Sequence, residues 1–269
     1  MDQEQDLKLA QMRESFERDG VFLAAKLLDA DALAEAKAAF DWSLANPSVG
    51  RTGDYGDEAG IQDLANPDAR EAYRPMLASS PLPALLSRLW GGGPVWFFYE
   101  QIFRKNGGAR RTAWHQDTPY LPIAGRQIAV AWMSFEAVDE AEALEFCLGS
   151  HLGPVYNGST FAIHDETDPF FKTGDLPRLP AIESNRGAWR IKGWSTEPGD
   201  VVIFHPSVLH GGGTPAPGRL RETLSLRFFG EDAVYARRPG PTPAPRIPGL
   251  DERLEDGAPF RDPAFARLA

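Results

Sequence analysis

The feature that most constrains the fold is the stretch from Pro94 to about residue 230, which is typical of a series of short strands. Four segments are rich in the aromatic and β-branched residues that strands favour, namely VWFFYEQIF, QIAVAWMSFEAV, ALEFCLGS and DVVIFHPSVLH. Gly, Pro and charged residues separate these segments, and no helices alternate with them. We therefore expect an antiparallel sandwich or barrel rather than a parallel sheet with crossover helices.

The first third of the chain is expected to be mostly helical. Apolar residues recur at helical spacing from Leu7 to Phe16, and a second helix is expected to run to about Leu44. A short strand at residues 21–25 separates them, and residues 48–62 are expected to form a loop.

We expect a single domain over residues 1–269, because one β core with additions reaches this length. Its parts are a helical support (1–92), a β core (93–232) with an insertion (154–190), and a Pro-rich tail (233–269). Both the insertion and the tail are candidate lids over a pocket.

Charge and composition limit the partners. The formal net charge is -10 and no run of Lys or Arg is longer than a pair, so phosphate-rich partners such as nucleic acids or anionic membranes are not expected. A small-molecule substrate is favoured, and the oligomeric state is not predicted. The N-terminal residues do not resemble an export signal, and Cys147 is the only cysteine and is expected to be a buried apolar residue, so we expect a cytoplasmic protein.

The segment Trp114-His115-Gln116-Asp117 offers two metal ligands. An imidazole and a carboxylate two residues apart lie on the same face of a strand, where both can reach one ion. This pair alone is weak evidence, and a third ligand is needed.

The third ligand is expected in EPGDVVIFHPSVLHGGG. His205 and His210 lie five residues apart, so in an extended strand only one of them faces the pocket. Three glycines after His210 allow close backbone approach, which favours His210 as the ligand and leaves His205 as structural. Two histidines and a carboxylate form the facial arrangement expected of non-haem iron(II) oxygenases, in which open positions remain for co-substrate and dioxygen.

A dicarboxylate co-substrate would leave a buried carboxylate for which arginine is the natural partner. The strand RLRETLSLRFF offers Arg219, Arg221 and Arg227. Arg221 and Arg227 are an even number of residues apart and would lie on the same face of a strand, but the leucines between them do not fit a simple alternation. Periodicity therefore does not decide which arginine binds the carboxylate. At least two of the three arginines are expected on the surface.

Four ordered blocks, WHQDTPY, AWMSFEAVDEAEALEFCLGSH, PGDVVIFHPSVLHGGG and RETLSLRF, resemble the phytanoyl-CoA dioxygenase family of iron and 2-oxoglutarate dependent oxygenases. The resemblance runs from about residue 97 to 230. It implies a mainly β fold with flanking helices (α+β), built on a double-stranded β-helix, or jelly-roll, core.

The resemblance also implies roles for individual residues. It implies that His115, Asp117 and His210 are the iron ligands and, as such, the catalytic residues. Arg221 matches the family arginine that pairs with the far carboxylate of 2-oxoglutarate, and Gln101 and Trp132 fall where relatives line the co-substrate pocket, with Lys105 a further candidate.

The expected activity is hydroxylation, or another oxidation, of an unactivated C–H bond of a small organic substrate. Fe(II) would be the cofactor, 2-oxoglutarate and O₂ would be consumed as co-substrates, and succinate and CO₂ would be released. The alternatives are a metal-dependent lyase or isomerase on the same barrel and a non-catalytic binding protein. Tyr120, Trp114 and Phe97 are candidate walls of the substrate pocket.

Overall fold

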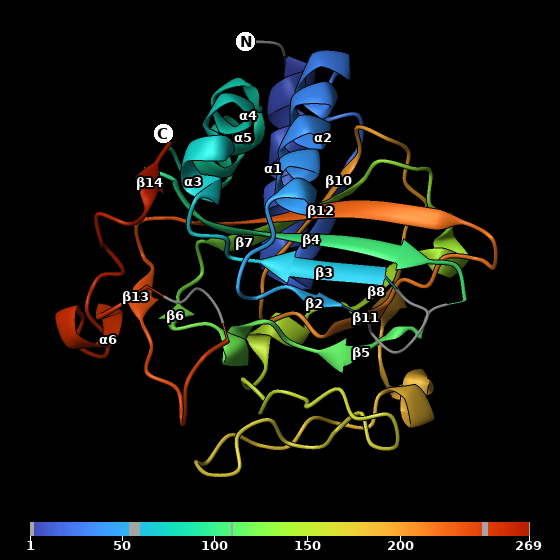
Figure 1. Cartoon of the computed structure of the whole chain (residues 1–269), viewed down its shortest axis with the longest axis vertical. Coiled ribbons are helices and arrows are strands. Elements are labelled where there is room, and N and C mark those ends of the chain that lie inside the picture. Colours follow the sequence, from blue (N-terminus) through green and yellow to red (C-terminus); the bar gives the residue numbers. More distant parts are fainter. Residues whose placement is uncertain (1–2, 54–59, 109, 244–246, 269) are drawn as a thin grey trace.

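The computed structural model describes residues 3–53, 60–108, 110–243 and 247–268. Figure 1 shows layers: helices cover one face of a large sheet, and a small sheet lies on the other side of it. The helices are α1 (Gln3–Asp19), α2 (Ala30–Ala45), α3 (Ala69–Ala72), α4 (Arg74–Ser79), α5 (Leu82–Leu89) and α6 (Leu250–Arg253).

The strands of the described residues form two larger sheets and a two-stranded pair, and all their pairings are antiparallel. The large sheet runs in the order β1 (Val21–Ala24), β10 (Val201–Phe204), β7 (Ile128–Ser134), β12 (Leu220–Phe229), β4 (Trp96–Asn106), β3 (Gly60–Leu64) and β2 (Thr52–Gly53), with β14 (Ala266–Arg267) also on β4. The small sheet runs β5 (Thr112–His115), β11 (His210–Gly212), β8 (Leu144–Cys147) and β9 (Ile191–Lys192), and β13 (Val234–Tyr235) pairs with β6 (Ile123–Ala124).

The principal core lies between the helices and the large sheet. Phe40 of α2 and Leu86 of α5 are fully buried there against sheet residues such as Ile102 and Leu224. Burial of such a side chain contributes about 1.5–3 kcal/mol to the stability of the fold. The packed helices therefore stabilise the large sheet, whose other face lines the space between the sheets.

Strand β12 shows how the two faces differ. Leu224, Leu226 and Phe228 pack in the helix-side core, while the odd-numbered residues from Arg221 to Arg227 face the space between the sheets. Leu224 and Leu226, which did not fit the pattern of the arginines, therefore lie on the opposite face of the same strand.

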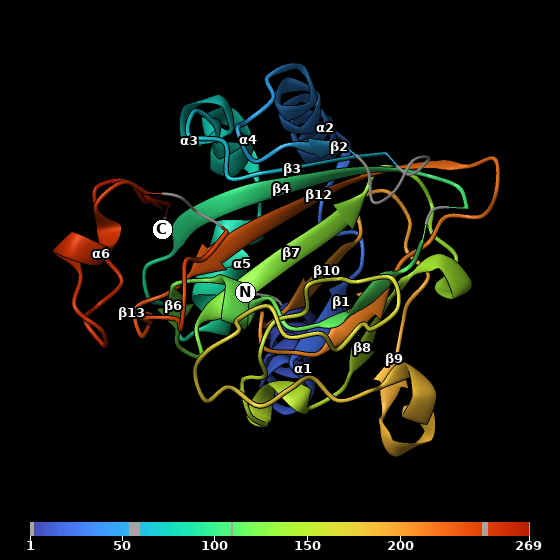
Figure 2. The same cartoon turned by 60° about the horizontal axis from the view of Figure 1, so that its bottom comes forward.

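The predicted fold, mainly β with flanking helices and a jelly-roll core, is confirmed, although its sheets do not close into a barrel. The expected loop at residues 48–62 is wrong in part, because it contains β2 and the start of β3; residues 54–59 lie outside the described part. Figure 2 shows the insertion 154–190 passing over the side of the small sheet, and the C-terminal tail lies at one end of the large sheet. No described helix has the length and apolar character needed to span a membrane.

Candidate active site

The three predicted metal ligands converge between the sheets. His115 ends β5 and His210 begins β11, and the two are direct partners across this antiparallel pair. Their ring centroids are 4.2 Å apart. One ligand atom from each of His115, Asp117 and His210 lies within 4.8 Å of the others, so all three can bind one metal ion.

Asp117 reaches this point from outside the strand, contrary to the expectation that it shares β5 with His115. It precedes a 3-10 turn, Thr118–Tyr120, and the backbone amides of Asp117 and Thr118 donate to the carbonyl of Pro206 at 2.8 and 3.1 Å. The turn brings Oδ1 of Asp117 to 3.4 Å from Nε2 of His115 and 3.9 Å from Nε2 of His210.

Both imidazoles are oriented for metal binding. Nδ1 of His115 lies 2.8 Å from the carbonyl of Ala113, and Nδ1 of His210 lies 3.0 Å from that of Val208. Since a carbonyl only accepts, each Nδ1 donates and each Nε2 keeps its lone pair for the metal. Burial, followed by the neighbouring His115, lowers the pKa of His210 to about 3, which favours the neutral, ligating form.

Arg227 was not singled out as a site residue, yet it contacts Asp117, one of the predicted metal ligands. Its Nη2 donates to Oδ2 of Asp117 at 3.0 Å and to Oε1 of Gln101 at 2.6 Å. Burial alone would raise the pKa of Asp117, but Arg227 and then His115 outweigh it and hold that pKa well below its usual range. The shared alternation phase of Arg221 and Arg227 was the available sequence signal for this position.

Two buried cations lie at one end of the pocket. Arg221 of β12 and Lys105 of β4 are register partners, 5% and 6% exposed. Arg221 donates to the carbonyls of Glu142 and Gly213, and no acidic side chain of the described residues forms an ion pair with it. Burial, followed by Arg221, lowers the pKa of Lys105 to about 7. The charge of these two basic side chains would favour an anionic group bound beside them.

The remaining arginine, Arg219, is on the surface, where it pairs with Asp139 and Glu142. The expectation that at least two of the three arginines are superficial is therefore wrong, because the odd-numbered positions of β12 face inward. Trp132 lies on the inner face of the neighbouring strand, with its ring 5.9 Å from the guanidinium of Arg221. Gln101 and Trp132 both line the pocket, which is consistent with the roles expected for them.

Glycines after His210 permit the close packing expected of them. A Cβ on Gly211 would lie 2.9 Å from the carbonyl oxygen of Thr112, and Gly213 has a φ of +77° and would bring a Cβ to 3.2 Å from Nη2 of Arg221. Side chains here would displace the strand that carries His210 or the arginine beside it.

The predicted metal ligands and the cations line one continuous pocket of about 730 Å³. Away from the cations its walls are mainly apolar or aromatic: Leu64, Ala65, Pro67, Tyr120, Leu121, Phe161, Phe170 and Pro243. Phe161 and Phe170 come from the insertion and Pro243 from the tail, so both candidate lids contribute.

Of the three aromatic residues expected in the walls, only Tyr120 lines this pocket. Trp114 packs on the far side of the small sheet and donates to Glu183 at 2.9 Å, and Phe97 is in the helix-side core. The predictions for Trp114 and Phe97 are wrong, because the alternation along a strand does not say which of its two faces points into the pocket unless the pairing with neighbouring strands is known.

Phe161 had no signal in the sequence. Its ring lies 5.1 Å from that of His115 and stacks on Tyr120 at 6.0 Å. Its backbone is in the left-handed region, at φ +58°, and Arg110 donates to its carbonyl at 3.1 Å. A strained residue held by its surroundings is typical of functional sites.

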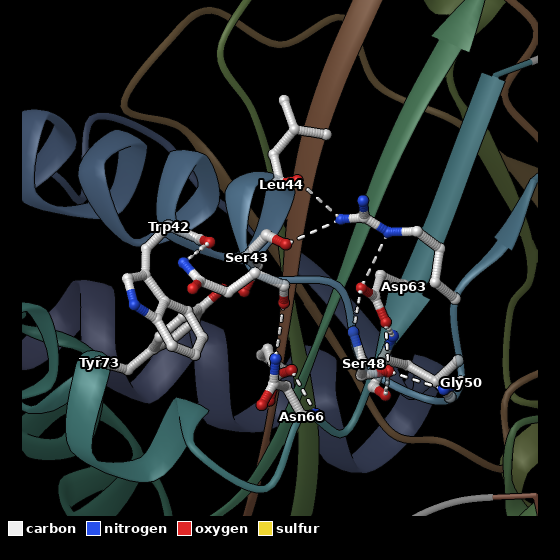
Figure 3. A network of polar contacts seen from close by, with 12 residues as sticks. Trp42, Ser43, Leu44, Ser48, Gly50, Asp63, Asn66 and Tyr73 are labelled. Carbon is white, nitrogen blue, oxygen red and sulfur yellow. Dashed lines mark hydrogen bonds and ion pairs between the residues drawn. The ribbon is translucent and has the colours of Figure 1, made fainter.

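One side of the pocket mouth is held by the polar network of Figure 3. Asp63 of β3 is buried and accepts hydrogen bonds from the amide of Ser48 at 2.9 Å and from Nε of Arg51 at 3.1 Å. These contacts fix the segment between α2 and β2, which includes Val49 and Gly50 of the pocket lining. Val49 is 92% exposed, which places it at the opening.

His205, His151 and Cys147 lie outside the predicted metal cluster. His205 contacts the carbonyl of Gly125 at 3.0 Å and accepts from the amide of Ser207, as expected of a structural residue. His151 contacts the carbonyl of Glu17, and Cys147 is fully buried in an apolar cluster.

Comparison with known proteins defines the class. A family model described as phytanoyl-CoA dioxygenase (PhyH) matches residues 16–221. This chain therefore belongs to the phytanoyl-CoA dioxygenase family. The curated peroxisomal phytanoyl-CoA dioxygenase of Rattus norvegicus is 26% identical over 133 residues, a match that covers 45% of this chain and 34% of that protein. The chain thus matches only about a third of that relative's length.

Solved structures share the fold over nearly the whole chain. The epimerase SnoN, in complex with Fe3+, alpha ketoglutarate and nogalamycin RO, has a TM-score of 0.74 at 22% identity and covers 98% of this chain and 100% of its own. The alpha ketoglutarate dependent carbocyclase SnoK has a TM-score of 0.70 at 19% identity, with 96% of each chain covered. EctD from S. alaskensis, with 2-oxoglutarate and 5-hydroxyectoine, has a TM-score of 0.64 at 18% identity and covers 93% of this chain and 88% of its own.

Iron and 2-oxoglutarate, the cofactors predicted from the sequence, are thus both present in structures of proteins with this fold. In this chain the predicted metal-binding residues come together in a group able to hold an ion.

Proposed function

We propose that this chain is an Fe(II) and 2-oxoglutarate dependent oxygenase that oxidises an unactivated C–H bond of a small organic substrate, with succinate and CO₂ as co-products. The observation that carries the proposal is the convergence of His115, Asp117 and His210 in a pocket that is also lined by the buried basic side chains of Arg221 and Lys105. Two imidazoles and one carboxylate are the donor set of non-haem iron(II) oxygenases.

The cationic end of the pocket supports 2-oxoglutarate as the co-substrate. Arg221 would pair with its far carboxylate, and Lys105 would add a second positive charge beside it. Trp132 lies next to Arg221 and walls this end. A dicarboxylate that reaches from this end to the metal ligands neutralises the cations and orients its keto acid toward the metal.

When bound, the metal would supply the oxygen chemistry, and the protein residues position the reactants around it. The Nδ1 contacts of His115 and His210 hold both rings, and Phe161 covers His115 on the pocket side. The apolar walls exclude water and leave room for a substrate held mainly by shape.

Hydroxylation is the outcome we favour, because Asp117 supplies a carboxylate where halogenating relatives have a small residue. A different oxidative outcome is the second candidate, since the similar folds include an epimerase and a carbocyclase. We further propose that residues 1–269 act as one domain, in which the insertion 154–190 and the tail set the substrate specificity.

The test is succinate formation from 2-oxoglutarate by the Fe(II)-loaded protein, with a screen of free acids, thioesters, amino-acid derivatives and polycyclic natural products. Stimulated turnover with a hydroxylated product supports the proposal, and an epimerised or cyclised product supports the second candidate. Metal binding without any 2-oxoglutarate turnover would instead indicate a lyase or isomerase, and a protein that binds neither would be a non-catalytic binding protein.

A further inference from the structure

Arg227 is a buried cation placed directly beside a metal ligand. It is 5% exposed, and its guanidinium carbon lies 4.6 Å from the centre of the Tyr99 ring. Its Nη2 is shared between Oδ2 of Asp117 and Oε1 of Gln101. Two residues of β4 and one beside the turn after His115 therefore meet at this one side chain.

The two carboxylate oxygens of Asp117 have different surroundings. Oδ1 faces Nε2 of His115 at 3.4 Å and Nε2 of His210 at 3.9 Å. Oδ2 is on the other side and accepts from Arg227 at 3.0 Å. A charge-assisted hydrogen bond of this length keeps Oδ2 away from the metal position.

We propose that Arg227 is a positioning residue that limits Asp117 to one ligand oxygen. The inference rests on the proposed function, since it concerns how the metal is held for 2-oxoglutarate. With one oxygen from Asp117 the protein supplies three donor atoms, and three positions of an octahedron stay open; with two oxygens only two would remain.

An arginine suits this role better than a simple positive charge would. The guanidinium donates to two acceptors in fixed directions, and Gln101 and Tyr99 hold it in place. A cation here also opposes the binding of a metal dication through like-charge repulsion, so metal affinity alone does not explain its presence.

The test compares Arg227→Met and Arg227→Lys with the unchanged protein, and uses Arg219→Met as a matched control on the surface of the same segment. Mn(II), a redox-stable probe, is titrated first, and 2-oxoglutarate is then titrated into the Mn(II)-loaded protein. We expect Arg227→Met to bind Mn(II) as tightly as the unchanged protein or more tightly, and to bind 2-oxoglutarate about tenfold more weakly or worse. Arg227→Lys should also weaken 2-oxoglutarate binding, because one ammonium lacks the two-acceptor geometry.

Infrared difference spectra of the Mn(II)-loaded protein with isotope-labelled aspartate provide a readout independent of activity. One-oxygen coordination separates the two carboxylate stretching bands more widely than two-oxygen coordination does. The separation should narrow in Arg227→Met and stay unchanged in Arg219→Met.

Three results would overturn the inference. The first is that the carboxylate bands and the affinities for Mn(II) and 2-oxoglutarate are unchanged in Arg227→Met. The second is full 2-oxoglutarate affinity in Arg227→Lys, which would show that only the positive charge of Arg227 matters. The third is a parallel loss of Mn(II) and 2-oxoglutarate binding with a lower Tm, which would make Arg227 merely structural. If the unchanged protein binds Mn(II) but no 2-oxoglutarate, the proposed function fails, while the infrared comparison still tests Arg227.

Discussion

Arg221 and Lys105 are register partners on β12 and β4, and together they place two buried cations at one end of the pocket while the metal ligands lie farther along it. A pair of basic side chains in the same pocket as a group able to hold a metal ion suits a short dicarboxylate that chelates a metal.

Replacing Arg221 should weaken the binding of 2-oxoglutarate. Because a hydrogen-bonded charge pair contributes about 1.5–3 kcal/mol, Arg221→Met should raise the Kd for 2-oxoglutarate roughly 10- to 100-fold, while metal affinity stays unchanged. Calorimetric titration of the metal-loaded protein measures both. Arg219→Met is the control and should behave like the unchanged protein; equal effects of the two variants would contradict the assignment.

His115→Ala and His210→Ala should each abolish high-affinity metal binding, because either change leaves only two of the three donor atoms. Anaerobic Fe(II) titration followed by analysis of the bound metal measures this. His164→Ala, at an exposed histidine of the insertion, is the control. A His210→Ala protein that still binds one Fe(II) at the original affinity would rule out the proposed centre.

Glu100 should make the stability of the protein depend on pH. It lies on the helix-side face of β4, where burial raises its pKa to about 8 from an ordinary value of 4.5, and it accepts from the amide of Asn66 at 2.8 Å. Because the folded state binds this proton more tightly than the unfolded state, stability is full below about pH 4.5 and declines as the pH rises towards about 8.

Glu100→Gln keeps an oxygen for Asn66 and removes the proton uptake. We expect it to be more stable than the unchanged protein at pH 8, by on the order of a few kcal/mol, and to lose most of the decline between pH 5 and 8. Urea unfolding across this range measures the effect. A stability difference between the variant and the unchanged protein that stays constant from pH 5 to 8 would show that Glu100 takes up no proton on folding.

Phe161 should tolerate glycine better than alanine. Its φ of +58° costs a residue with a Cβ about 1 kcal/mol, and Phe161→Ala keeps that cost while Phe161→Gly removes it. Both variants lose the ring, so the difference between their Tm values reports the cost of the left-handed backbone conformation at position 161. The glycine variant should unfold at the higher temperature. A higher Tm for Phe161→Ala would show that the left-handed conformation relaxes once the ring is gone.

The sequence predicted the components of the site better than their contacts. The spacing of His115 and Asp117, the glycines after His210 and the resemblance to a family were sufficient to name three residues that the structure brings into one group able to hold a metal ion. That Arg227 faces Asp117 depends on the pairing of β12 with β4 and on the turn after His115, which no local pattern specifies. Trp114 was misplaced for the same reason, since one residue along a strand changes the face.

We propose that one ferrous ion and 2-oxoglutarate bind together at His115, Asp117 and His210. The most direct measurement is an anaerobic titration of the protein and 2-oxoglutarate with Fe(II), followed by the visible charge-transfer absorption of the iron–2-oxoglutarate chelate. We predict a band that saturates at one Fe(II) per chain and is missing from a folded His210→Ala protein. A folded, unchanged protein that gives no band, or a band that survives in His210→Ala, would contradict this assignment.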